Sequence, residues 1–208
     1  MIKIARRTLL VSLAALPVMG VSAIGKASAA EPPQGVVRAY YEVLLGVMKE
    51  AGKLGFAGRY ERLKPAVEKV FNLPLMTRLA VGPGWESLTP AQQQQMVAFF
   101  ADLTVATYAN RFDGYDGETF EVVPDTVSSP SGTMVQSRLI KKQGDPIVLN
   151  YLMRDSGGSW QAIDVFLGGT VSELATRRSE FTSVLRRDGA EGLLSLLRQR
   201  IQDMKKAA

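Results

Sequence analysis

The side chains available for chemistry in this 208-residue chain are carboxylates, arginines, lysines and hydroxyls, because it contains no histidine and no cysteine. Histidine is the commonest general base and the usual zinc ligand, and cysteine supplies the thiol nucleophile. Their absence excludes Ser-His hydrolases, zinc peptidases, histidine-based phosphatases and disulfide frameworks. A glycosidase that uses two carboxylates stays open as a distant alternative. We therefore expect a protein that is not an enzyme and needs no cofactor or metal.

Two carboxylate-bearing stretches are the remaining candidates for a polar site. Residues 113–118 read Asp-Gly-Tyr-Asp-Gly-Glu, which places oxygen ligands beside glycines but lacks the Asp-x-Asp-x-Asp-Gly order of a calcium loop. We interpret this stretch as a turn between a helix and a strand. Asp164 lies within a predicted strand, where a carboxylate needs a partner, so we expect it to bond a neighbouring backbone group or an arginine.

The first 29 residues have the three parts of a secretory signal peptide. A basic start at residues 3–7 is followed by an apolar core at residues 9–24 and by the small-x-small site Ala27-Ser28-Ala29. The core is shorter than the roughly 20 apolar residues of a membrane span and is interrupted by proline and glycine. We predict export to the periplasm by the Sec or, given the pair Arg6-Arg7, the twin-arginine route. Cleavage is expected near Ala29, with an uncleaved anchor as the alternative.

Removal of this segment changes the charge balance of the chain. The full sequence has 25 basic and 20 acidic side chains and a net charge of +5. Four of the basic ones and none of the acidic ones lie within residues 1–29, so residues 30–208 carry 21 basic against 20 acidic groups, or +1. Nucleic-acid binding needs a clustered basic face, and none is apparent in this part of the sequence. We therefore expect no nucleic-acid partner.

Helical spacing of apolar residues predicts three helices in the first part of residues 30–208. The first ends near Gly52, and the others span residues 59–71 and 75–81. The sequence Thr89-Pro90-Ala91-Gln92 is a capping box with proline at the first helical position, and it predicts a long helix that runs to about Phe112. Residues 171–187, and the segment after the break at Asp188-Gly189, predict two further helices.

Between residues 118 and 167 the apolar period changes from helical to two. Strands are predicted around residues 120–122, 135–140, 147–153 and 160–166, with Pro-, Ser- and Gly-rich turns between them. Short turns favour an antiparallel meander. Helices on one face of a twisted four-stranded antiparallel sheet give an α+β fold, with residues 30–208 as its single domain.

The most specific motifs lie in the C-terminal half. A Gly-Ser-Trp turn at residues 158–160 is followed by Asp164-Val165 and then Gly168, by Arg178-Ser179-Glu180-Phe181, and by Gly189 four residues before Leu193. Earlier in the chain, Trp85-x-x-Leu88 precedes Gln94, Phe99, Leu103 and Tyr108. This order resembles the MlaC family, also called toluene-tolerance proteins, and the resemblance covers most of residues 30–208.

Several expectations follow from the resemblance. Members of the family are periplasmic phospholipid carriers with a cone-shaped, cystatin-like or nuclear-transport-factor-like sheet wrapped by helices, and they hold phospholipid tails between the two layers. A lipid cavity between sheet and helices is therefore implied here. After Gly169 the chain is one residue longer than the usual pattern and has Arg177 where tyrosine is common. This variant resembles the hopanoid-associated HpnM branch, so a phospholipid and a hopanoid are both expected cargoes.

A cavity for lipid tails needs apolar walls. Each buried methylene contributes about 0.8 kcal/mol of binding free energy, and one long chain must gain ~10 kcal/mol to leave a membrane. Spacing alone favours a closed core, since apolar helical stripes usually pack. The resemblance favours a cavity instead. The residues expected to face it are Met76, Leu79, Phe99, Phe100, Leu103, Val135, Leu139, Val148, Leu152, Ile163, Val165, Phe181 and Leu185.

Arginines are the candidates for polar recognition by such a carrier. Arg78 and Arg111 flank predicted helix ends and are expected to hold a lipid headgroup at the cavity mouth. The arginine-rich helix is the expected docking face, through Arg177, Arg178, Arg186 and Arg187. The partners implied are an inner-membrane transporter complex, an outer-membrane lipoprotein complex, or both, with transient membrane contact. The alternative function is a non-enzymatic periplasmic module whose core is closed and which docks a membrane transport complex.

Overall fold

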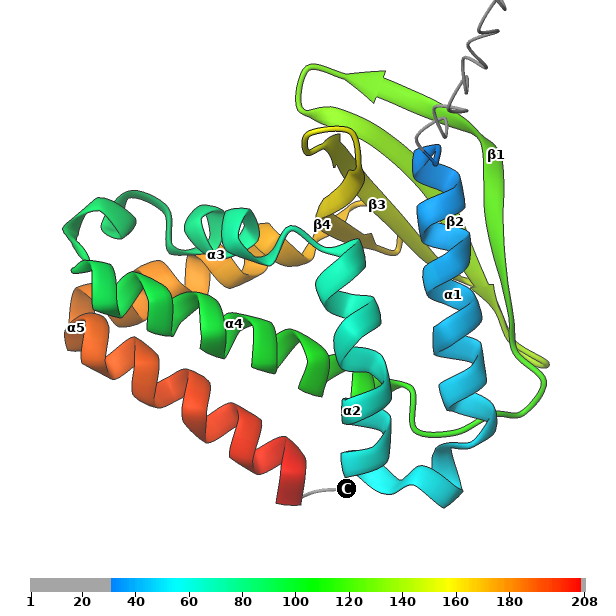
Figure 1. Cartoon of the computed structure of the whole chain (residues 1–208), viewed down its shortest axis with the longest axis horizontal. Helices are drawn as coiled ribbons and strands as arrows, with labels where there is room; N and C mark the ends of the chain where they lie inside the picture. The colour runs from blue at the N-terminus through cyan, green and yellow to red at the C-terminus, as the bar shows by residue number, and fades with distance from the viewer. Residues whose placement is uncertain (1–30, 207–208) are drawn as a thin grey trace, which may run out of the picture.

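The computed structural model describes residues 31–206, so the predicted signal peptide lies outside the described residues. Helices come first, then strands, then a final long helix (Figure 1). The elements are α1 (Pro33–Lys49), α2 (Ala51–Val70), α3 (Leu73–Val81), the 3₁₀ helix η1 (Gly82–Ser87), α4 (Pro90–Arg111), β1 (Thr119–Ser129), β2 (Gly132–Ile140), β3 (Ile147–Asp155), β4 (Trp160–Leu167), β5 (Val171–Ser172) and α5 (Glu173–Lys206). The predicted α+β class is confirmed.

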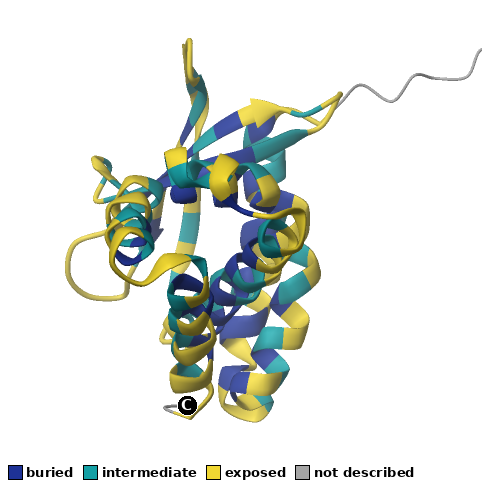
Figure 2. Ribbon diagram, turned by 90° about the vertical axis from the view of Figure 1, so that its left-hand side faces the viewer, coloured by how far each residue is buried: buried dark blue, intermediate teal, exposed yellow. Residues whose placement is uncertain are grey.

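The elements form two regions that meet along α2. In the sheet region, α1 lies across β1, β2 and β4, while in the helical lobe α4 contacts both α3 and α5 (Figure 1). The buried residues of the helices gather on the sides that face other elements, and the exposed residues lie on the outer sides (Figure 2). Within residues 31–206, no helix is both long and apolar enough to cross a membrane.

The sheet is an antiparallel meander in the order β1-β2-β3-β4-β5. Its register places Val135 opposite Tyr151, and Tyr151 opposite Val165. Because side chains alternate along a strand, these three residues share one face of the sheet, and all three are buried. The four predicted strands are confirmed, whereas residues 171 and 172, predicted as helix, form the short fifth strand beside β4.

The hydrogen bonds of Asp164 explain why α5 begins two residues later than predicted. Its side-chain oxygens accept hydrogen bonds from the Ser172 hydroxyl at 2.5 Å and from the Leu174 backbone N–H at 3.0 Å. The Ser172 hydroxyl oxygen in turn accepts from the backbone N–H of Ala175 at 2.8 Å, which caps α5. The carboxylate thus joins β4, β5 and the start of α5. The expectation that Asp164 bonds backbone groups is confirmed.

Two glycines shape the helices at sites where the predicted boundaries were only partly right. Gly55 has φ of +57° and kinks α2, so the expected gap between residues 52 and 59 is instead helical on both sides of one kink. Gly189 has φ of +69° and breaks α5 where a break was predicted. After that break α5 folds back on itself, since Arg200 in its second half is hydrogen-bonded to Glu180 in its first half.

The start of α4 follows the sequence signal closely. The Thr89 hydroxyl oxygen accepts from the Gln92 backbone N–H at 3.3 Å, and the Gln92 side-chain oxygen accepts from the Thr89 N–H at 3.1 Å. This reciprocal pair is the predicted capping box. The other end of α4 is held by buried Arg59 of α2, which donates to the Ala109 carbonyl at 2.8 Å and to the Ala51 carbonyl at 3.3 Å. Arg59 therefore fixes the last turn of α4 against α2.

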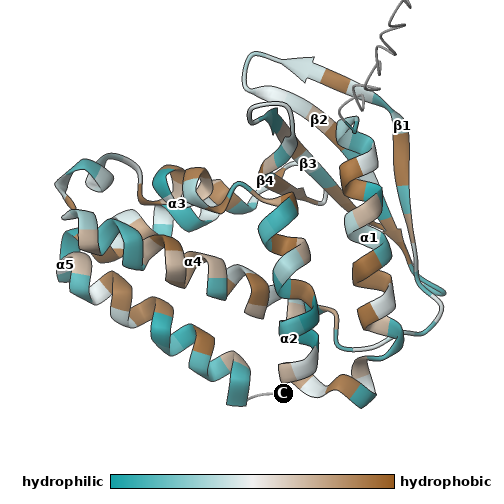
Figure 3. Ribbon diagram, in the orientation of Figure 1, coloured by the Kyte–Doolittle hydropathy of each residue, from teal (hydrophilic) through white to brown (hydrophobic). Residues whose placement is uncertain are grey.

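The core differs in composition between the two regions. An aromatic cluster fills the space between α1, α4 and the sheet, with Tyr41 stacked on Phe120 at 4.1 Å between ring centroids. In the helical lobe, aliphatic residues of α4 and α5 predominate, together with one edge-to-face pair of Phe100 and Phe181 at 6.3 Å. The apolar residues of α4 and α5 appear as brown bands along both helices (Figure 3). Both parts belong to one continuous core cluster.

Candidate functional site

The main pocket lies where the last turn of α4 meets the ends of β2, β3 and β4. Its volume is about 690 Å³, within the range of about 300–1,000 Å³ that is usual for small-ligand sites. The loop of residues 112–118 and the end of α1 complete its walls. Its lining residues are Met48, Tyr108, Arg111, Phe112, Asp113, Gly114, Tyr115, Asp116, Glu118, Leu139, Lys141, Ile147, Leu149, Val165, Leu167 and Glu173.

One wall of the main pocket is aliphatic because of the register of the strands. Leu139 pairs with Ile147, and Leu149 pairs with Leu167, so their side chains lie on the same face of the sheet. Val165 lies two residues before Leu167 and shares that face. Ile147, at 41% exposed, lies toward the rim, whereas Leu149 is buried. The wall therefore runs from solvent to the core without a polar side chain between.

The opposite wall is aromatic. Tyr108 and Phe112 are four residues apart at the end of α4, and their rings stack at 5.8 Å between centroids with an angle of 11° between the planes. Tyr115 in the following loop is 43% exposed, and the Lys49 ammonium lies 5.5 Å from its ring centroid. This wall offers flat apolar surface with hydroxyl groups, and its outer part is accessible to solvent.

The mouth of the main pocket carries charges of both signs. Arg111 approaches Glu173 at 3.7 Å, and Lys142 approaches Asp116 at 3.2 Å beside the lining residue Lys141. The Glu118 carboxylate accepts a hydrogen bond from the Asp116 backbone N–H. The stretch 113–118 is thus the helix-to-strand turn that was expected. Among residues 31–206, no cluster of acidic side chains is arranged to hold a metal ion.

Four tyrosines in and behind the aromatic wall keep the interior neutral. Burial raises the pKa of Tyr108, Tyr40 and Tyr151 well above the usual value of 10, and burial raises the pKa of Tyr41 to about 12. The Tyr41 hydroxyl is hydrogen-bonded to the Ser137 hydroxyl at 2.6 Å. These phenols therefore stay protonated at neutral pH. The arrangement as a whole presents an apolar chamber with a polar mouth.

Comparison with known proteins agrees with this arrangement. The family described as "MlaC protein" matches residues 39–199, which is most of the described chain. The chain belongs to the MlaC family. The toluene tolerance protein ttg2D of Pseudomonas putida is 26% identical over 194 residues, covering 91% of this chain and 86% of that protein.

A solved structure shares the fold. The phospholipid-binding protein of Ralstonia solanacearum, determined in complex with a phospholipid, superposes with a TM-score of 0.74 at 22% sequence identity. The match covers 84% of this chain and 99% of that one. The predicted family and the α+β architecture are thereby confirmed, whereas the resemblance to the HpnM branch stays a prediction.

The residues predicted to face lipid tails fall into three groups in this MlaC-family fold. Leu139 and Val165 line the main pocket. The second group is buried in the closed core and lines no part of this pocket; its members are Met76, Phe100, Leu103, Val135 and Phe181. The third and largest group lines no part of the main pocket and lies outside the buried core cluster; its members are Leu79, Phe99, Val148, Leu152, Ile163 and Leu185.

Strand register explains the misplaced sheet residues. Val148 pairs with Arg138, and Leu152 pairs with Met134 and Asp164, so both side chains lie on the sheet face opposite to Leu149 and Tyr151. Ile163 is the extra residue of a β-bulge between β3 and β4. The expectation that Val148 and Leu152 face the gap is wrong by one residue of alternation, whereas Ile163 is buried but belongs neither to the core cluster nor to the lining of the main pocket.

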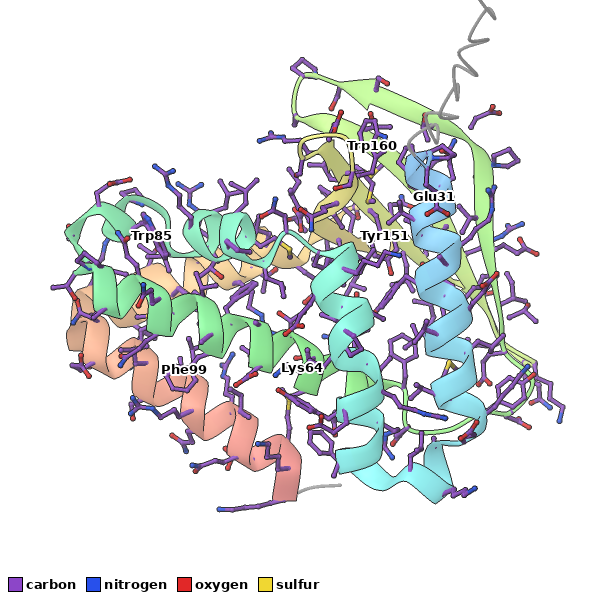
Figure 4. The ribbon with its side chains drawn as sticks, in the orientation of Figure 1. Glu31, Lys64, Trp85, Phe99, Tyr151 and Trp160 are labelled. Carbon is purple, nitrogen blue, oxygen red and sulfur yellow. The ribbon has the colours of Figure 1, made fainter. Side chains whose placement is uncertain are left out.

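The misplaced helical residues belong to the outer side of the helical lobe. Phe99 is half-buried with the guanidinium of Arg198 5.0 Å from its ring centroid, and Leu185 lies in a shallow groove beside η1. Figure 4 shows Phe99 and Trp85 in this lobe, apart from Tyr151 of the sheet region. Neither Phe99 nor Leu185 reaches the main pocket, because α4 meets the sheet only with its last turn.

The two predicted headgroup arginines have different surroundings. Arg111 lies at the mouth of the main pocket, as expected for such a role. Arg78 lies on α3 in the helical lobe and is hydrogen-bonded to Glu86 at 2.8 Å. Its predicted position at the mouth is wrong, since α3 packs against α5 and η1. A further basic residue, Lys141 after β2, lines the mouth together with Arg111.

The four predicted docking arginines do not all lie on one face. Arg178, Arg186 and Arg187 line one shallow groove on the outer side of α5, with Ser179, Thr182 and Ser183 between them. Arg177 points elsewhere: its side chain is 20% exposed and lies 3.9 Å from Glu180. Burial, together with the nearby Arg200, lowers its pKa. Neighbouring residues on a helix point about 100° apart, which separates Arg177 from the expected face.

Most of the lining residues were not predicted from the sequence. They include Met48, Tyr108, Phe112, Tyr115, Ile147, Leu149 and Leu167. The strand members carried a usable signal, because alternation through Leu149 and Tyr151 of β3 would have placed them on the face of Leu139. The loop residue Tyr115 carried none, since its position depends on how residues 112–118 fold across the mouth.

Proposed function

We propose that this MlaC-family protein is a lipid carrier that shelters hydrocarbon tails in the main pocket and leaves the polar headgroup at its mouth. The observation that carries the proposal is the junction of an aliphatic wall, an aromatic wall and a charged rim around one chamber of about 690 Å³. The structural relative from R. solanacearum was determined in complex with a phospholipid, which supports a phospholipid as the cargo. A hopanoid is the second cargo to test.

The energetics of the main pocket suit extraction without covalent chemistry. Each methylene that leaves water for the apolar chamber contributes about 0.8 kcal/mol, so about ten sheltered methylenes supply roughly 8 kcal/mol. Arg111 and Lys141 at the mouth are placed to bond an anionic headgroup, since guanidinium and ammonium groups are the usual phosphate partners. The carrier then works by binding and release, and no residue needs a catalytic role.

The setting that we propose is the periplasm, after removal of residues 1–29. There the carrier meets an inner-membrane transporter complex, an outer-membrane lipoprotein complex, or both, and contacts membranes only transiently. The groove lined by Arg178, Arg186 and Arg187 is the proposed docking face. Charge-guided docking favours fast and reversible encounters, which a shuttle requires.

A closed interaction module remains the second candidate, and one observation favours it. Phe100, Leu103 and Val135 are at most 4% exposed, so a large part of the expected cavity is packed core. Under this alternative the main pocket is a surface depression, and the protein acts only by docking a membrane transport complex.

Native mass spectrometry of protein purified from the periplasm separates the two candidates. The carrier is expected to retain about one lipid per chain, recoverable by organic extraction. The variant Leu167→Asn should lose it, because an amide in the aliphatic wall lacks a partner. The matched control Val127→Asn changes an exposed residue on β1 and should retain lipid. Parent protein that is repeatedly lipid-free and also refuses added lipid would establish the closed module instead.

A further inference from the structure

A second apolar pocket lies between α1 and α2. Its volume is about 420 Å³. Most of its lining is apolar, and the two smallest side chains in it are Ala39 of α1 and Ala66 of α2. We call it the α1–α2 pocket; its lining residues are Glu31, Val36, Ala39, Tyr40, Val43, Arg62, Pro65, Ala66, Lys69 and Val70.

A pair of aromatic rings connects the linings of the two pockets. Tyr40 lines the α1–α2 pocket, and Tyr108 lines the main pocket. Their ring centroids are 5.6 Å apart, and the planes meet edge to face at 82°. The linings of the two pockets are therefore in contact through this pair of rings, which we call the partition. A displacement of these rings would make the cavities continuous.

Tyr40 is held less firmly than its neighbour Tyr41. The buried hydroxyl of Tyr40 makes no hydrogen bond of normal geometry, although Tyr108 lies near it, whereas the Tyr41 hydroxyl is bonded to Ser137. Tyr40 is kept in place by ring contacts, including an edge-to-face contact with Phe71 at 5.8 Å. An unpaired buried hydroxyl disfavours the closed position, because the group regains hydrogen bonds if it moves toward water. The partition is thus weakest at Tyr40.

The charged residues at the edge of the α1–α2 pocket do not call for a polar ligand. Arg62 is already bonded to Glu50 at 2.7 Å. The interior is formed by valine, alanine and proline side chains and by the Tyr40 ring. Such walls suit a hydrocarbon, which needs no hydrogen-bond partner.

We propose that the α1–α2 pocket receives the far end of a long hydrocarbon chain whose nearer part occupies the main pocket, with the Tyr40–Tyr108 pair as the gate between them. The inference rests on the proposed function and adds a second compartment to it. It makes chain length the property that the protein discriminates. Short chains fill the main pocket alone, and long chains displace Tyr40 and continue between α1 and α2.

Filling the α1–α2 pocket tests this directly. The variant Ala66→Phe places a ring in the space without changing any residue of the main pocket. The probes are lysophosphatidylcholines with chains from octanoyl to stearoyl, titrated into delipidated protein. Each sheltered methylene tightens binding about fourfold, so the affinity of the parent protein should rise along the series. The control Ala98→Phe adds the same ring to an exposed position on α4.

We expect Ala66→Phe to bind the octanoyl probe like the parent and the stearoyl probe about sixtyfold more weakly, which corresponds to the loss of about three methylenes. Ala98→Phe should match the parent for every probe. Equal stearoyl affinity in Ala66→Phe and the parent overturns the second compartment but leaves the main pocket intact. A parent protein that binds no member of the series contradicts the proposed function itself. If Ala66→Phe does not fold, Ala39→Leu fills the same pocket from α1 and carries the same two outcomes.

Discussion

The helical lobe and the end of the sheet region that holds the main pocket both contain large apolar side chains but pack them differently. In the lobe, α4 contacts both α3 and α5, and Leu103 is 1% exposed. At the main pocket the last turn of α4 faces strand ends and a loop, and a chamber of about 690 Å³ stays open. The number of elements that face a helix, more than its apolarity, decides whether a stripe of large residues closes into a core or borders a cavity.

The lobe should behave as closed core, and its disruption gives the largest effect. Leu103→Ala removes a fully buried side chain and should lower the free energy of unfolding by about 2–5 kcal/mol. Lipid retention in the folded variant should be unchanged, because Leu103 lines no part of the main pocket. Urea unfolding measures the first quantity and native mass spectrometry the second. Lost lipid in a well-folded Leu103→Ala protein would place the tails in the lobe.

The tyrosines of the sheet region give that region a sensitivity to high pH. The pKa of Tyr41 is about 12 in the folded protein and 10 when exposed, so folding stability is intact below pH 10 and falls as the pH rises toward 12. The loss for this one group is about 3 kcal/mol. Denaturant unfolding followed across this pH window measures it. Tyr41→Phe should flatten the decline, and an unchanged decline would show that Tyr41 is not its source.

A polar substitution in the main pocket should lower folding stability less than one in the lobe, but it should weaken lipid binding. Leu167 is only half-buried, so Leu167→Asn should cost less than about 1.5 kcal/mol of stability. Affinity for a phospholipid should nevertheless fall about thirtyfold, since the amide has no partner in the aliphatic wall. A fluorescent phospholipid titration gives the affinity. If the affinity of Leu167→Asn equals that of Val127→Asn, the aliphatic wall does not contact the tails.

The smallest effect is expected on the outer face of the lobe. Reversal of both Arg178 and Arg186 to glutamate should slow lipid transfer to acceptor membranes about fivefold at low ionic strength and leave bound lipid unchanged. The difference should shrink at high salt, because the charges are exposed. The control reverses Arg38 and Lys53, two exposed basic residues on α1 and α2. Equal transfer by both double variants would remove this groove from the docking proposal.

The elements could be predicted from the sequence because their signals are local. The capping box at Thr89, the break at Gly189 and the period-two strands each depend on a few neighbouring residues, and all appear in the structure. The family could also be predicted from the sequence, because its motifs are short local patterns. Errors at the element ends, such as the helical stretch before Gly55, arose where packing extended a helix beyond its local signal.

The main pocket was only partly predictable because it depends on long-range register. Leu139 and Val165 were identified, but Val148 and Leu152 were assigned to the wrong face of the sheet. A β-bulge at Ile163 shifts the alternation of side chains between the two faces of the sheet along β4, and no local motif predicts this bulge. Arg111 was placed correctly because it ends a helix that the capping box had already defined. Arg78 was placed wrongly, because the packing of α3 against α5 is a tertiary contact that no local motif predicts.

Tail-brominated phospholipid distinguishes the two regions most directly, because bromine quenches tryptophan fluorescence only at short range. One protein carries its single tryptophan at the main pocket, through Ile147→Trp with Trp85→Phe and Trp160→Phe. The other keeps Trp85 in the helical lobe and carries only Trp160→Phe (Figure 4). Both should bind the brominated phospholipid. Strong quenching of the first and weak quenching of the second is the predicted result, and quenching of Trp85 that equals or exceeds that of the pocket tryptophan would contradict the main pocket as the site of the tails.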